Sequence, residues 1–471
     1  MSELLDLFAR IAPARPAIRF EGETFDHGAF AALVDSWARR LSGAGIVQGD
    51  RVALLSANRP DYPALVLACA KLGAILVTLN WRLAPAEHQF ILDDSGAKIL
   101  LTERGFVGPK APRVSILDEE DLPEAAYARA DADEAPVLLV YTSGTTGRSK
   151  GALLDQAALV ANARNSWAMH AMVPDDRVLT VLPMFHVGGL NIQTLPALLL
   201  GAEVSIHRRF DPSATLDAIA REKPTLTLLV PATIQAVRAH PAWAVTDLSC
   251  LRAVGTGSSI VPVDLIRAFH ARGVPVLNVY GSTETAPIAS LTTLADAIAK
   301  EGSVGRAAPT CEVRIVAGEI QVRGPNVTKG YWNAPDATRN AFDGDWFKTG
   351  DVGHYDSEGY LWVDERKNDM IISGGENVYP AEIEAVLNAA PGIADSAVVA
   401  RPDPKWGEVP VAFVVLKPGA SFARPILDGK LARFKQPKDY FVVDTLPRNA
   451  MGKVLRYELR AQARQRGEQA Q

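Results

Sequence analysis

The chain has 471 residues, of which 48% are hydrophobic and 22% are charged. This composition is typical of a globular protein, excludes a disordered or collagen-like chain, and leaves room for about three domains or for one large domain with a smaller attachment. The 49 basic and 54 acidic side chains give a formal net charge of −5. The chain therefore has no overall basic field that would attract nucleic acid or an anionic membrane.

The N-terminal segment and the cysteines indicate the compartment. Residues 1–16 include Glu3 and Asp6 and no uninterrupted apolar region, so they lack the pattern of a signal peptide. The longest apolar stretches, such as 195–202, are too short to span a bilayer. The three cysteines are far apart and fit neither a disulfide framework nor a zinc cluster. We therefore expect a cytoplasmic protein with no membrane span.

Residues 51–281 alternate short apolar runs with longer amphipathic ones. Parallel strands need helical crossovers and are buried on both faces, so this alternation predicts a mostly parallel sheet covered by helices. In chain order, strands are expected at 51–56, 74–80, 178–183, 203–207, 225–230, 251–254 and 274–281, and helices at 60–73, 211–223, 231–240 and 263–273.

The pattern of apolar and polar residues changes twice after residue 302. Segments 312–324 and 353–365 alternate apolar and polar residues around glycine-containing turns, which predicts antiparallel hairpins. A helix is expected after Pro380, strands are expected at 396–400, 411–417 and 439–443, and the polar tail after Arg460 is expected to be frayed. The predicted fold class is α/β. A large N-terminal domain (1–364) has helix-covered, mostly parallel sheets and a small antiparallel β subdomain, and a small α+β domain (365–471) follows.

Residues 141–151, YTSGTTGRSKG, directly follow an apolar run. Small hydroxyl and glycine residues followed by a lysine supply backbone N–H groups, hydroxyls and one cation that can converge on phosphate oxygens. The segment is not a Walker A loop, because Ser149 stands where that motif has glycine directly before the lysine. A phosphate-binding loop is the preferred interpretation, and a flexible turn is the alternative.

The same segment resembles the phosphate-loop signature of the adenylate-forming (AMP-binding) enzymes, which include acyl-CoA synthetases, adenylation domains of peptide synthetases, and luciferases. Further segments follow in the order of that superfamily: FHVGG at 185–189, YGSTE at 280–284, TGD at 349–351, ERKNDMIISGGENVYPAEIE at 365–384 and PRNAMGK at 447–453. The resemblance covers almost the whole chain and is to the carboxylate:CoA ligase branch.

The resemblance implies a site for ATP and Mg²⁺. Tyr280 would stack on adenine and Asp351 would accept hydrogen bonds from the ribose hydroxyls, while Glu284 and Thr146 would hold the magnesium ion, which prefers oxygen ligands. The implied nucleotide-binding residues are Thr142, Ser143, Gly144, Thr145, Thr146, Gly147, Lys150, Gly257, Ser258, Ser259, Tyr280, Gly281, Ser282, Thr283, Asp351 and Arg366. Ser258 and Ser259 depart in side chain from the usual adenine-contacting loop.

Four residues are implied in catalysis: Lys453, Glu284, Thr283 and His186. A carboxylate that attacks the α-phosphate of ATP brings two anions together, and a lysine positioned there stabilises charge that develops in the transition state. Lys453 matches the mobile adenylation lysine of the superfamily; without its motif it would be taken for a solvated lysine. His186 is expected to contact the acid and not to transfer a proton, and outside the motif it would be a structural histidine.

The implied acid pocket consists of His186, Val187, Gly188, Gly189, Val279 and Gly281. Relatives that use malonate-type acids carry an arginine and a second histidine where this chain has Val279 and Gly188. A dicarboxylate would therefore lack charge partners, and the acid is expected to be monocarboxylic and largely apolar. We expect a medium- or long-chain fatty acid, with an aryl acid of the feruloyl, coumaroyl or benzoate type as the alternative.

The C-terminal segments are implied in binding coenzyme A. The residues concerned are Ser373, Gly374, Gly375, Glu376, Trp406, Phe434, Lys435 and Lys438. An exposed tryptophan beside basic residues suits a nucleotide diphosphate, and packing at a domain seam is the alternative. The resemblance also implies that the small domain is mobile, with Asn368 at a hinge position where Asp or Lys is usual.

The predicted activity is an ATP-dependent carboxylate:CoA ligation that proceeds through an acyl-adenylate. The acid and ATP would give the adenylate and pyrophosphate, and the CoA thiolate would then displace AMP. The partners expected are the acid, ATP, Mg²⁺ and CoA, with no nucleic acid, in a monomer or homodimer. The competing hypotheses are a stand-alone adenylation enzyme that loads a carrier protein and a nonenzymatic nucleotide-binding protein.

Overall fold

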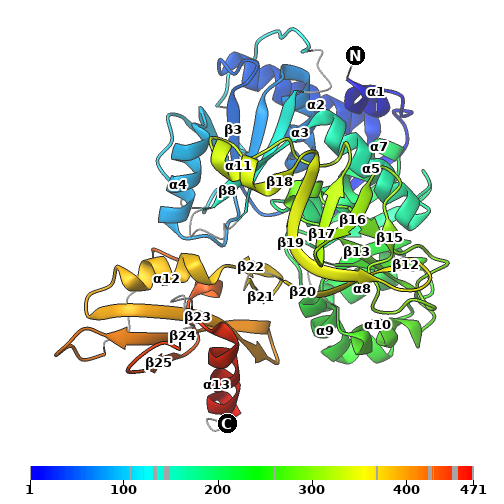
Figure 1. Ribbon diagram of the computed structural model, residues 1–471. Coiled ribbons are helices and arrows are strands. Elements are labelled where there is room, and N and C mark those ends of the chain that lie inside the picture. Colours follow the sequence, from blue (N-terminus) through cyan, green and yellow to red (C-terminus); the bar gives the residue numbers. More distant parts are fainter. Residues whose placement is uncertain are drawn as a thin grey trace. The chain divides into compact units, whose positions relative to one another are not determined.

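The computed structural model describes residues 2–106, 108–119, 121–130, 135–142, 149–257, 261–366, 370–422, 427, 429–447 and 454–468 (Figure 1). The chain divides into two compact units. The first comprises Met1–Trp81, Leu92–Tyr141 and Gly151–Glu365, and the second comprises Arg82–Ile91, Thr142–Lys150 and Arg366–Gln471. A search of the described residues finds no helix with the length and apolar character that a bilayer crossing requires.

The largest sheet of the first unit has nine strands in the order β15-β14-β13-β12-β11-β9-β10-β1-β2. The strands from β13 to β1 pair in parallel, and the antiparallel pairs lie at the two edges. Strands β11, β12 and β13 are buried along their length, as expected for a parallel sheet covered on both faces. The bounds are β1 (Pro16–Phe20), β2 (Glu23–Asp26), β9 (Arg177–Thr180), β10 (Glu203–Ile206), β11 (Leu226–Leu229), β12 (Ala253–Thr256), β13 (Val276–Tyr280), β14 (Ser290–Leu291) and β15 (Arg306–Ala307).

A second sheet has six strands in the order β6-β5-β3-β4-β7-β8, and the pairs from β6 to β7 are parallel. Its strands are β3 (Arg51–Leu55), β4 (Ile75–Thr78), β5 (Ile99–Thr102), β6 (Val114–Ile116), β7 (Pro136–Thr142) and β8 (Lys150–Asp155). The two mostly parallel sheets confirm the predicted α/β class.

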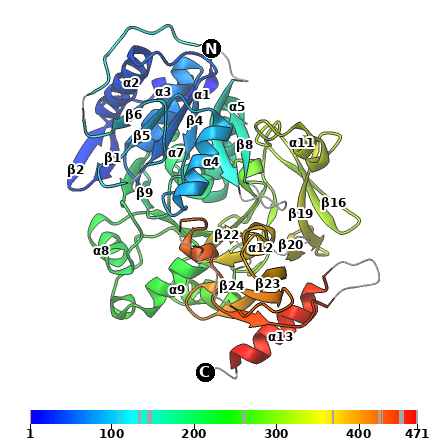
Figure 2. The same cartoon turned by 90° about the vertical axis from the view of Figure 1, so that its left-hand side faces the viewer.

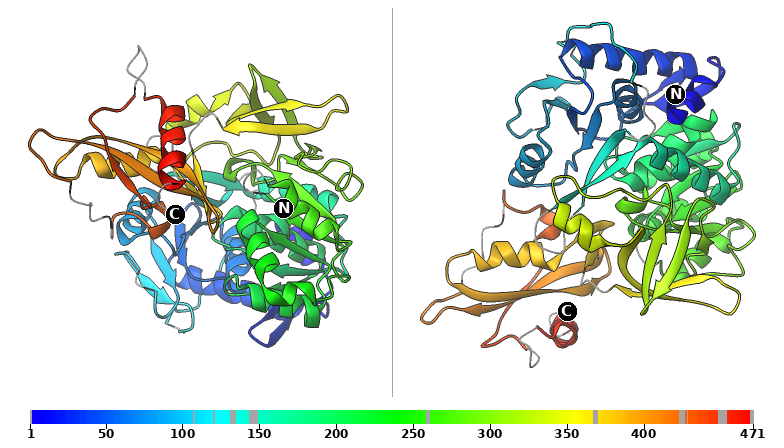
Figure 3. Two further views of the ribbon diagram at one scale, coloured as in Figure 1. Left: turned by 90° about the horizontal axis from the view of Figure 1, so that it is seen from below. Right: turned by 45° about the horizontal axis from the view of Figure 1, so that its top comes forward.

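Helices cover these sheets, and α2 packs beside α3 (Figures 2 and 3). Several helices begin at an aspartate whose side chain accepts a backbone N–H of the first turn, as Asp26, Asp155 and Asp211 do at 2.7–2.8 Å. The bounds are α1 (Glu3–Ala9), α2 (His27–Gly43), α3 (Asp61–Leu72), α4 (Pro85–Ser95), α5 (Gln156–His170), α6 (Val187–Gly189), α7 (Leu195–Leu200), α8 (Pro212–Glu222), α9 (Pro231–Ala239), α10 (Val263–His270) and α11 (Pro335–Ala341), with short 3₁₀ turns η2 (Pro241–Ala244) and η3 (Thr283–Thr285).

A π-helical turn, η1 (Leu190–Thr194), lies between α6 and α7. The apolar periodicity of the sequence did not predict it, because its five residues are all buried and carry no distinguishing pattern. Single π-turns are frequent at functional sites, and this one directly follows the FHVGG segment.

The predicted hairpins form an antiparallel sheet in the order β16-β17-β19-β18, with β20 paired to β19 (Figure 2). Its strands are β16 (Glu312–Val316), β17 (Glu319–Arg323), β18 (Phe342–Asp343), β19 (Trp346–Tyr355) and β20 (Leu361–Arg366). The small antiparallel subdomain is therefore confirmed.

The second unit contains a five-stranded sheet between two helices (Figure 1). Val398 on β23 faces the cluster that includes Ile383 and Leu387 of α12, whereas its neighbour Val399 faces the cluster that includes Leu459 of α13. Successive side chains of a strand point to opposite faces, so each helix covers one face. The elements are β21 (Ile371–Ser373), β22 (Glu376–Val378), α12 (Pro380–Asn388), β23 (Ile393–Asp403), β24 (Gly407–Leu416), η4 (Arg433–Lys435), β25 (Tyr440–Val442) and α13 (Arg456–Glu468).

The expectation of a frayed tail after Arg460 is wrong for the residues up to 468. Helix α13 continues through this stretch, and Leu459 and Ala463 are buried in the cluster that includes Val399 and Phe413. Two residues four positions apart lie on the same face of a helix, so both apolar residues face the sheet although charged residues dominate the composition of the tail.

His170 is a buried histidine at the end of α5 with no exposed surface. Its Nδ1 lies 2.9 Å from the Ser166 carbonyl oxygen and its Nε2 lies 3.0 Å from the Gln193 amide nitrogen. Burial lowers the pKa of His170 from 6.5 to about 4. A histidine whose folded pKa lies below its unfolded pKa stabilises the fold above the unfolded value, and this contribution is lost as the pH falls.

We expect the free energy of unfolding to fall by about 3 kcal/mol more in the wild type than in His170→Gln as the pH is lowered from 6.5 to 4. The glutamine keeps hydrogen-bonding groups in the core but does not titrate. Urea unfolding at a series of pH values measures the difference. Parallel stability curves for the two proteins would contradict a neutral, buried His170.

Candidate active site

Three of the predicted segments follow parallel strands of the nine-stranded sheet. The FHVGG segment comes after β9, Gly257 directly follows β12, and Tyr280 is the last residue of β13. The strands from β9 to β13 pair in parallel, so their carboxyl ends meet at one edge of the sheet. Open α/β sheets bind ligands at this edge, and the three segments therefore belong to one candidate site in the first unit.

Tyr280 and Asp351 are joined directly, although 71 positions separate them. The Tyr280 hydroxyl donates a 2.8 Å hydrogen bond to Oδ2 of Asp351, and both residues are buried. The Thr349 hydroxyl accepts the Asp351 backbone N–H and donates to the Ile320 carbonyl oxygen at 2.7 Å. The carboxylate predicted to hold ribose is thus oriented by the aromatic residue predicted to contact adenine.

Gly281 begins a tight loop after β13. Its φ is 154°, and a Cβ atom here would lie 1.8 Å from the Pro287 carbonyl oxygen, so a side chain does not fit. The Thr285 hydroxyl closes the loop, because it accepts the Ser282 N–H at 3.0 Å and donates to Pro287 at 2.8 Å. Within the described residues the buried Ser282 hydroxyl oxygen has no hydrogen-bond partner, which suits a loop that receives a polar ligand.

Glu284 is held by a segment from another part of the first unit. The Tyr331 hydroxyl donates to Oε1 of Glu284 at 2.8 Å, and the Thr328 N–H donates to the Glu284 carbonyl oxygen at 2.7 Å. Tyr331 also forms a β-bridge with Ala152, two residues after Lys150. The carboxylate therefore lies on the same local framework as the strand that leaves the phosphate loop.

The residues around Glu284 fit a magnesium ion that is completed by phosphate oxygens and water. Mg²⁺ takes hard oxygen ligands and is commonly held by one or two carboxylates together with substrate phosphates. The search of the described residues finds no group of three or more histidine, cysteine, aspartate or glutamate side chains that could hold a metal. A single buried carboxylate, Glu284, agrees with a metal shared with the nucleotide rather than a closed protein site.

The phosphate loop is described at its two ends. Thr142 ends β7 and Lys150 begins β8, and the Thr142 hydroxyl donates to the Lys150 carbonyl oxygen at 3.4 Å. The preceding Tyr141 donates a 2.6 Å hydrogen bond to Asp94, and burial together with that bond raises the pKa of Tyr141. The predicted residues Ser143, Gly144, Thr145, Thr146 and Gly147 lie outside the described residues.

The imidazole of His186 lies against other aromatic rings. Its centroid is 4.5 Å from that of Phe185, whose ring in turn meets Trp81 edge to face at 6.3 Å. The Phe185 carbonyl oxygen accepts a 2.8 Å hydrogen bond from Thr78. The segment that carries His186 is thus anchored to the core by Phe185, while His186 itself is partly exposed.

The two glycines after Val187 have different surroundings. A Cβ atom on Gly189 would lie 2.2 Å from the Pro183 carbonyl oxygen, so the backbone approach requires glycine there. A Cβ atom on Gly188 would meet no atom within 4 Å. The fold therefore does not require a glycine at 188, and the missing side chain leaves open space at this position, two residues after His186.

Gly257 and Val279 lie against each other at the ends of adjacent strands. A Cβ atom on Gly257 would lie 2.5 Å from the Val279 carbonyl oxygen, so this position also requires glycine. The predicted Ser258 and Ser259 lie outside the described residues. The Val279 side chain is apolar and buried. It therefore offers no charge partner for a second carboxylate, which agrees with the expectation of an apolar acid.

In the second unit, Trp406 covers the turn of the SGGEN segment. The Gly374 N–H donates to the Trp406 carbonyl oxygen at 2.8 Å, and a Cβ atom on Gly374, whose φ is 60°, would lie 2.7 Å from the indole. Trp406 remains 41% exposed, so its ring has surface for a further stacking partner. Ser373 and Glu376 are buried beside the turn that contains Gly375.

The basic residues predicted for CoA differ in exposure. Lys435 is buried and its ammonium donates to Glu382 at 2.7 Å, with the ring of neighbouring Phe434 5.9 Å away. Lys438 is exposed, and its backbone N–H donates to the Pro410 carbonyl oxygen at 2.8 Å. An ammonium already paired with a carboxylate has fewer protons for a phosphate, so the role of Lys435 stays a prediction. Asn368, Lys453 and the side chain of Arg366 lie outside what the structure describes.

Sequence reasoning missed the residues that hold the site together. Tyr331 and Thr328 contact the predicted residue Glu284, and Asp94 contacts Tyr141 at the start of the 141–151 segment, but all three lie outside the motifs that carry the resemblance. Tyr331 reaches Glu284 across 47 positions, and no spacing rule links residues so far apart. The only local signal is an aromatic residue in GYW shortly after the hairpin of β16 and β17.

Two family profiles match the chain. The profile described as AMP-binding enzyme matches residues 5–332, and the one described as AMP-binding enzyme C-terminal domain matches residues 382–453. The chain is 47% identical to the indoleacetate–CoA ligase of Aromatoleum aromaticum, covering 98% of this chain and 97% of that protein. It is 39% identical to a feruloyl-CoA synthase of Amycolatopsis (96% of each chain) and 37% identical to a long-chain-fatty-acid–CoA ligase of Mycobacterium tuberculosis (92% of each).

Solved structures share the fold over the whole chain. An o-succinylbenzoate CoA synthetase variant from Bacillus subtilis, bound to a product analogue, is 32% identical with a TM-score of 0.87 over 98% of each chain. The same synthetase in complex with ATP and magnesium is 32% identical with a TM-score of 0.72, over 98% of this chain and 99% of that one. The likeness extends across both family profiles.

Proposed function

The chain belongs to the AMP-binding enzyme family and is an AMP-forming carboxylate:CoA ligase, and from this premise we propose that its preferred acid carries an aromatic ring. The enzyme joins a carboxylic acid to CoA with ATP, and releases AMP and pyrophosphate. The identity of the acid is the open step, because the relatives named above act on both aryl and fatty acids. The observation that carries the aromatic proposal is the open space at Gly188, in the same FHVGG segment as the partly exposed His186.

Several features support an aromatic acid. A flat ring needs width close to the carboxylate, and the missing side chain at Gly188 supplies space, whereas the neighbouring Gly189 is required by a backbone contact. The ring of Phe185 packs against the imidazole of His186, so the imidazole can offer a flat surface to an aromatic acid. Aromatic pairs prefer tilted or offset contacts at such distances. Two of the relatives, the indoleacetate and feruloyl ligases, are named for acids of this class.

A fatty acid is the second candidate, and the sequence by itself placed it first. The relative named as a long-chain-fatty-acid ligase supports it at 37% identity. Open space at Gly188 would also admit the alkyl chain of a fatty acid. The two candidates therefore differ in whether the rate depends on the width of the acid, as for an aryl ring, or on its length, as for an alkyl chain.

In the proposed site, Asp351 binds the ribose hydroxyls, Tyr280 contacts adenine, and Thr283 with the phosphate loop binds phosphate. Glu284 would hold Mg²⁺, which when bound offsets the negative charge of the phosphates. Lys453 would approach the α-phosphate from the small domain, residues 365–471, which turns about Asn368. In its second orientation Trp406 and the SGGEN turn would bind the pantetheine and adenine of CoA, which the exposed indole supports.

A panel of acids followed by pyrophosphate release tests the proposal. Indoleacetate, phenylacetate, ferulate and benzoate represent aryl acids, octanoate and palmitate represent fatty acids, and malonate represents dicarboxylates. We expect an aryl acid to give the highest kcat/KM, with thioester formed when free CoA is added. A higher kcat/KM for octanoate or palmitate would favour the second candidate, and strong malonate activity would contradict the apolar pocket.

The Gly188→Leu variant, measured with the same panel of acids, tests whether the space at Gly188 accommodates the ring of an aryl acid. We expect kcat/KM for the best aryl acid to fall by about tenfold or more, because a buried clash of a few methylenes is worth about 1–3 kcal/mol. Acetate, which does not reach the space, should lose less than about threefold. Gly189→Ala is the matched control: its Cβ would meet the Pro183 carbonyl, so it should lower the thermal midpoint, whereas Gly188→Leu should not. Equal loss for acetate and aryl acids would contradict the pocket.

A further inference from the structure

The loop that carries Glu284, residues 282–288, has little regular structure of its own. It contains the 3₁₀ turn η3, and side chains from other elements bond the Thr285 and Ala286 carbonyl oxygens and the Ile288 N–H. We call it the Glu284 loop. A buried loop must satisfy its backbone N–H and carbonyl groups, so the residues that bond them set where Glu284 stands.

Asn162 on α5 connects this loop to the π-turn η1. Its side-chain oxygen accepts the Ile288 N–H at 3.1 Å, and its side-chain nitrogen donates to the Asn191 carbonyl oxygen at 2.6 Å. Asn162 is 1% exposed. One buried amide therefore holds a backbone group of the Glu284 loop with one end and a backbone group of η1 with the other.

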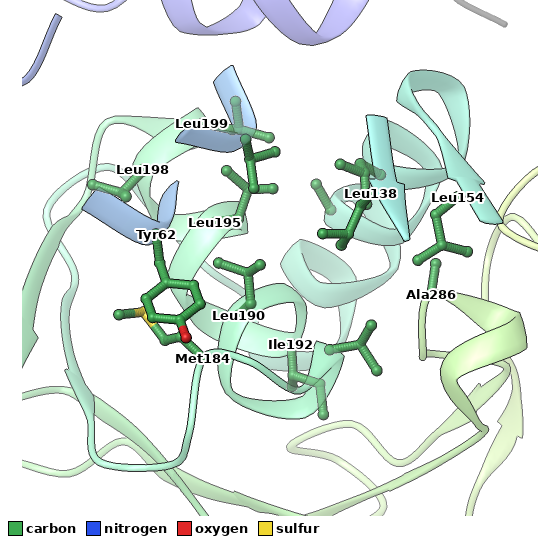
Figure 4. Packing of buried hydrophobic residues seen from close by; sticks show 14 of the residues in the cluster. Tyr62, Leu138, Leu154, Met184, Leu190, Ile192, Leu195, Leu198, Leu199 and Ala286 are labelled. Atoms are coloured by element: carbon green, nitrogen blue, oxygen red, sulfur yellow. The ribbon is translucent and has the colours of Figure 1, made fainter. Parts of the chain in front are cut away.

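Asn191 completes the connection from the other side. Its side-chain nitrogen donates to the Ala286 carbonyl oxygen at 3.3 Å. Leu190 and Ile192 of η1 and Ala286 of the Glu284 loop also belong to one buried apolar cluster (Figure 4). The two segments are thus tied by two amides and packed on a shared core, although about a hundred positions separate them in the sequence.

Because η1 directly continues the His186–Gly189 segment, a shift of that segment reaches η1 first. We propose that Asn162 and Asn191 are positioning residues that couple the acid segment to the Glu284 loop, so that occupation of the nucleotide side and of the acid side favour each other. This rests on the proposed function, which assigns Glu284 to magnesium and His186 to the acid. Such coupling is reciprocal and typically changes an affinity by about 5- to 150-fold.

Two neighbouring amides on the same helix provide matched controls. Asn165 is also buried and donates to the Ile288 carbonyl oxygen at 3.2 Å, and its other bonds among the described residues are to Cys311 and Thr310, not to η1. Gln156, at the start of α5, is buried and bonds Ser2 and Ala70. Asn165→Leu therefore removes a hydrogen bond to the Glu284 loop but leaves the bonds between the loop and η1 in place. Gln156→Leu removes a buried amide that bonds neither the loop nor η1.

Amide hydrogen exchange of the full chain measures the coupling without turnover. The probe is Mg²⁺ with α,β-methylene-ATP, which cannot be cleaved to an adenylate. In the wild type we expect it to slow exchange in residues 282–288 and also in residues 187–194. In Asn162→Leu the slowing at 282–288 should remain, whereas that at 187–194 should fall by at least about fivefold. Asn165→Leu and Gln156→Leu should both keep the effect at 187–194.

The outcomes separate the inference from the function on which it rests. No slowing at 282–288 in the wild type would overturn the Glu284 assignment and the coupling with it. Slowing at 282–288 without slowing at 187–194, or an undiminished effect in Asn162→Leu, would overturn the coupling alone, as would an equal loss in Asn165→Leu. If Asn162→Leu does not fold, Asn191→Leu removes only the 3.3 Å bond to Ala286 and should lose at least half of the effect at 187–194.

Discussion

Lys453→Ala should form pyrophosphate at a rate lower by about two to three orders of magnitude, as expected when one preorganised group that stabilises transition-state charge is removed. The acid carboxylate and the α-phosphate are both anionic, and the loss of the lysine leaves the charge of their approach uncompensated. The same variant should convert supplied acyl-adenylate and CoA to thioester at close to the wild-type rate. Pyrophosphate release and thioester formation, measured separately, give the two rates.

Lys417→Ala is the control for Lys453→Ala, because Lys417 is an exposed lysine at the end of β24 and has no proposed role. It should leave both half-reactions unchanged. A Lys453→Ala enzyme that loses both half-reactions to the same extent would indicate a structural lysine and would remove the central assumption about the adenylation step.

Glu284→Gln should lower the rate of pyrophosphate formation by about 100-fold or more and should raise the magnesium concentration needed for half of the maximal rate. The substitution keeps the shape of the side chain and an oxygen that can accept from Tyr331, but it removes the charge that a divalent cation requires. The rate as a function of Mg²⁺ concentration at saturating ATP and acid is the measurement. An unchanged magnesium requirement would mean that Glu284 does not hold the ion.

Tyr331→Phe tests the same site through a residue that holds Glu284 in position. It removes the 2.8 Å hydrogen bond to Glu284 and leaves the carboxylate in place. Because a hydrogen bond to a charged group contributes about 1.5–3 kcal/mol, the rate should fall by about tenfold, less than in Glu284→Gln. A Tyr331→Phe enzyme that is as impaired as Glu284→Gln would show that the tyrosine acts in its own right.

The parts of the fold that the sequence predicted well are those with local causes. Buried runs such as 225–230 and amphipathic runs such as 263–273 have their periodicity written in consecutive residues, and the structure has β11 and α10 there. The π-turn at 190–194 and helix α13 were not predicted. In the first all residues are buried, and in the second two apolar residues among many charges supply the attachment, so neither has a strong local pattern.

The candidate site divides in the same way. The resemblance of the YGSTE and TGD segments to the family gave Tyr280, Glu284 and Asp351 their predicted roles in nucleotide and metal binding. The partners that orient them come from distant parts of the chain: Tyr331 for Glu284 and Asn162 for the loop. The residues around an asparagine on a helix do not indicate which distant backbone amide its side chain will hydrogen-bond.

The sequence by itself therefore determined the family and the class of reaction, since the motifs that carry the resemblance are short runs of consecutive residues, and it predicted the groups that would perform the chemistry. Only the tertiary structure decided which glycine faces open space and which residues contact Tyr280 and Glu284. Gly188 and Gly189 are alike in sequence, but one faces open space and the other a backbone carbonyl. The physical reason is that steric room and hydrogen-bond satisfaction are properties of three-dimensional packing between segments that the chain brings together only when it folds.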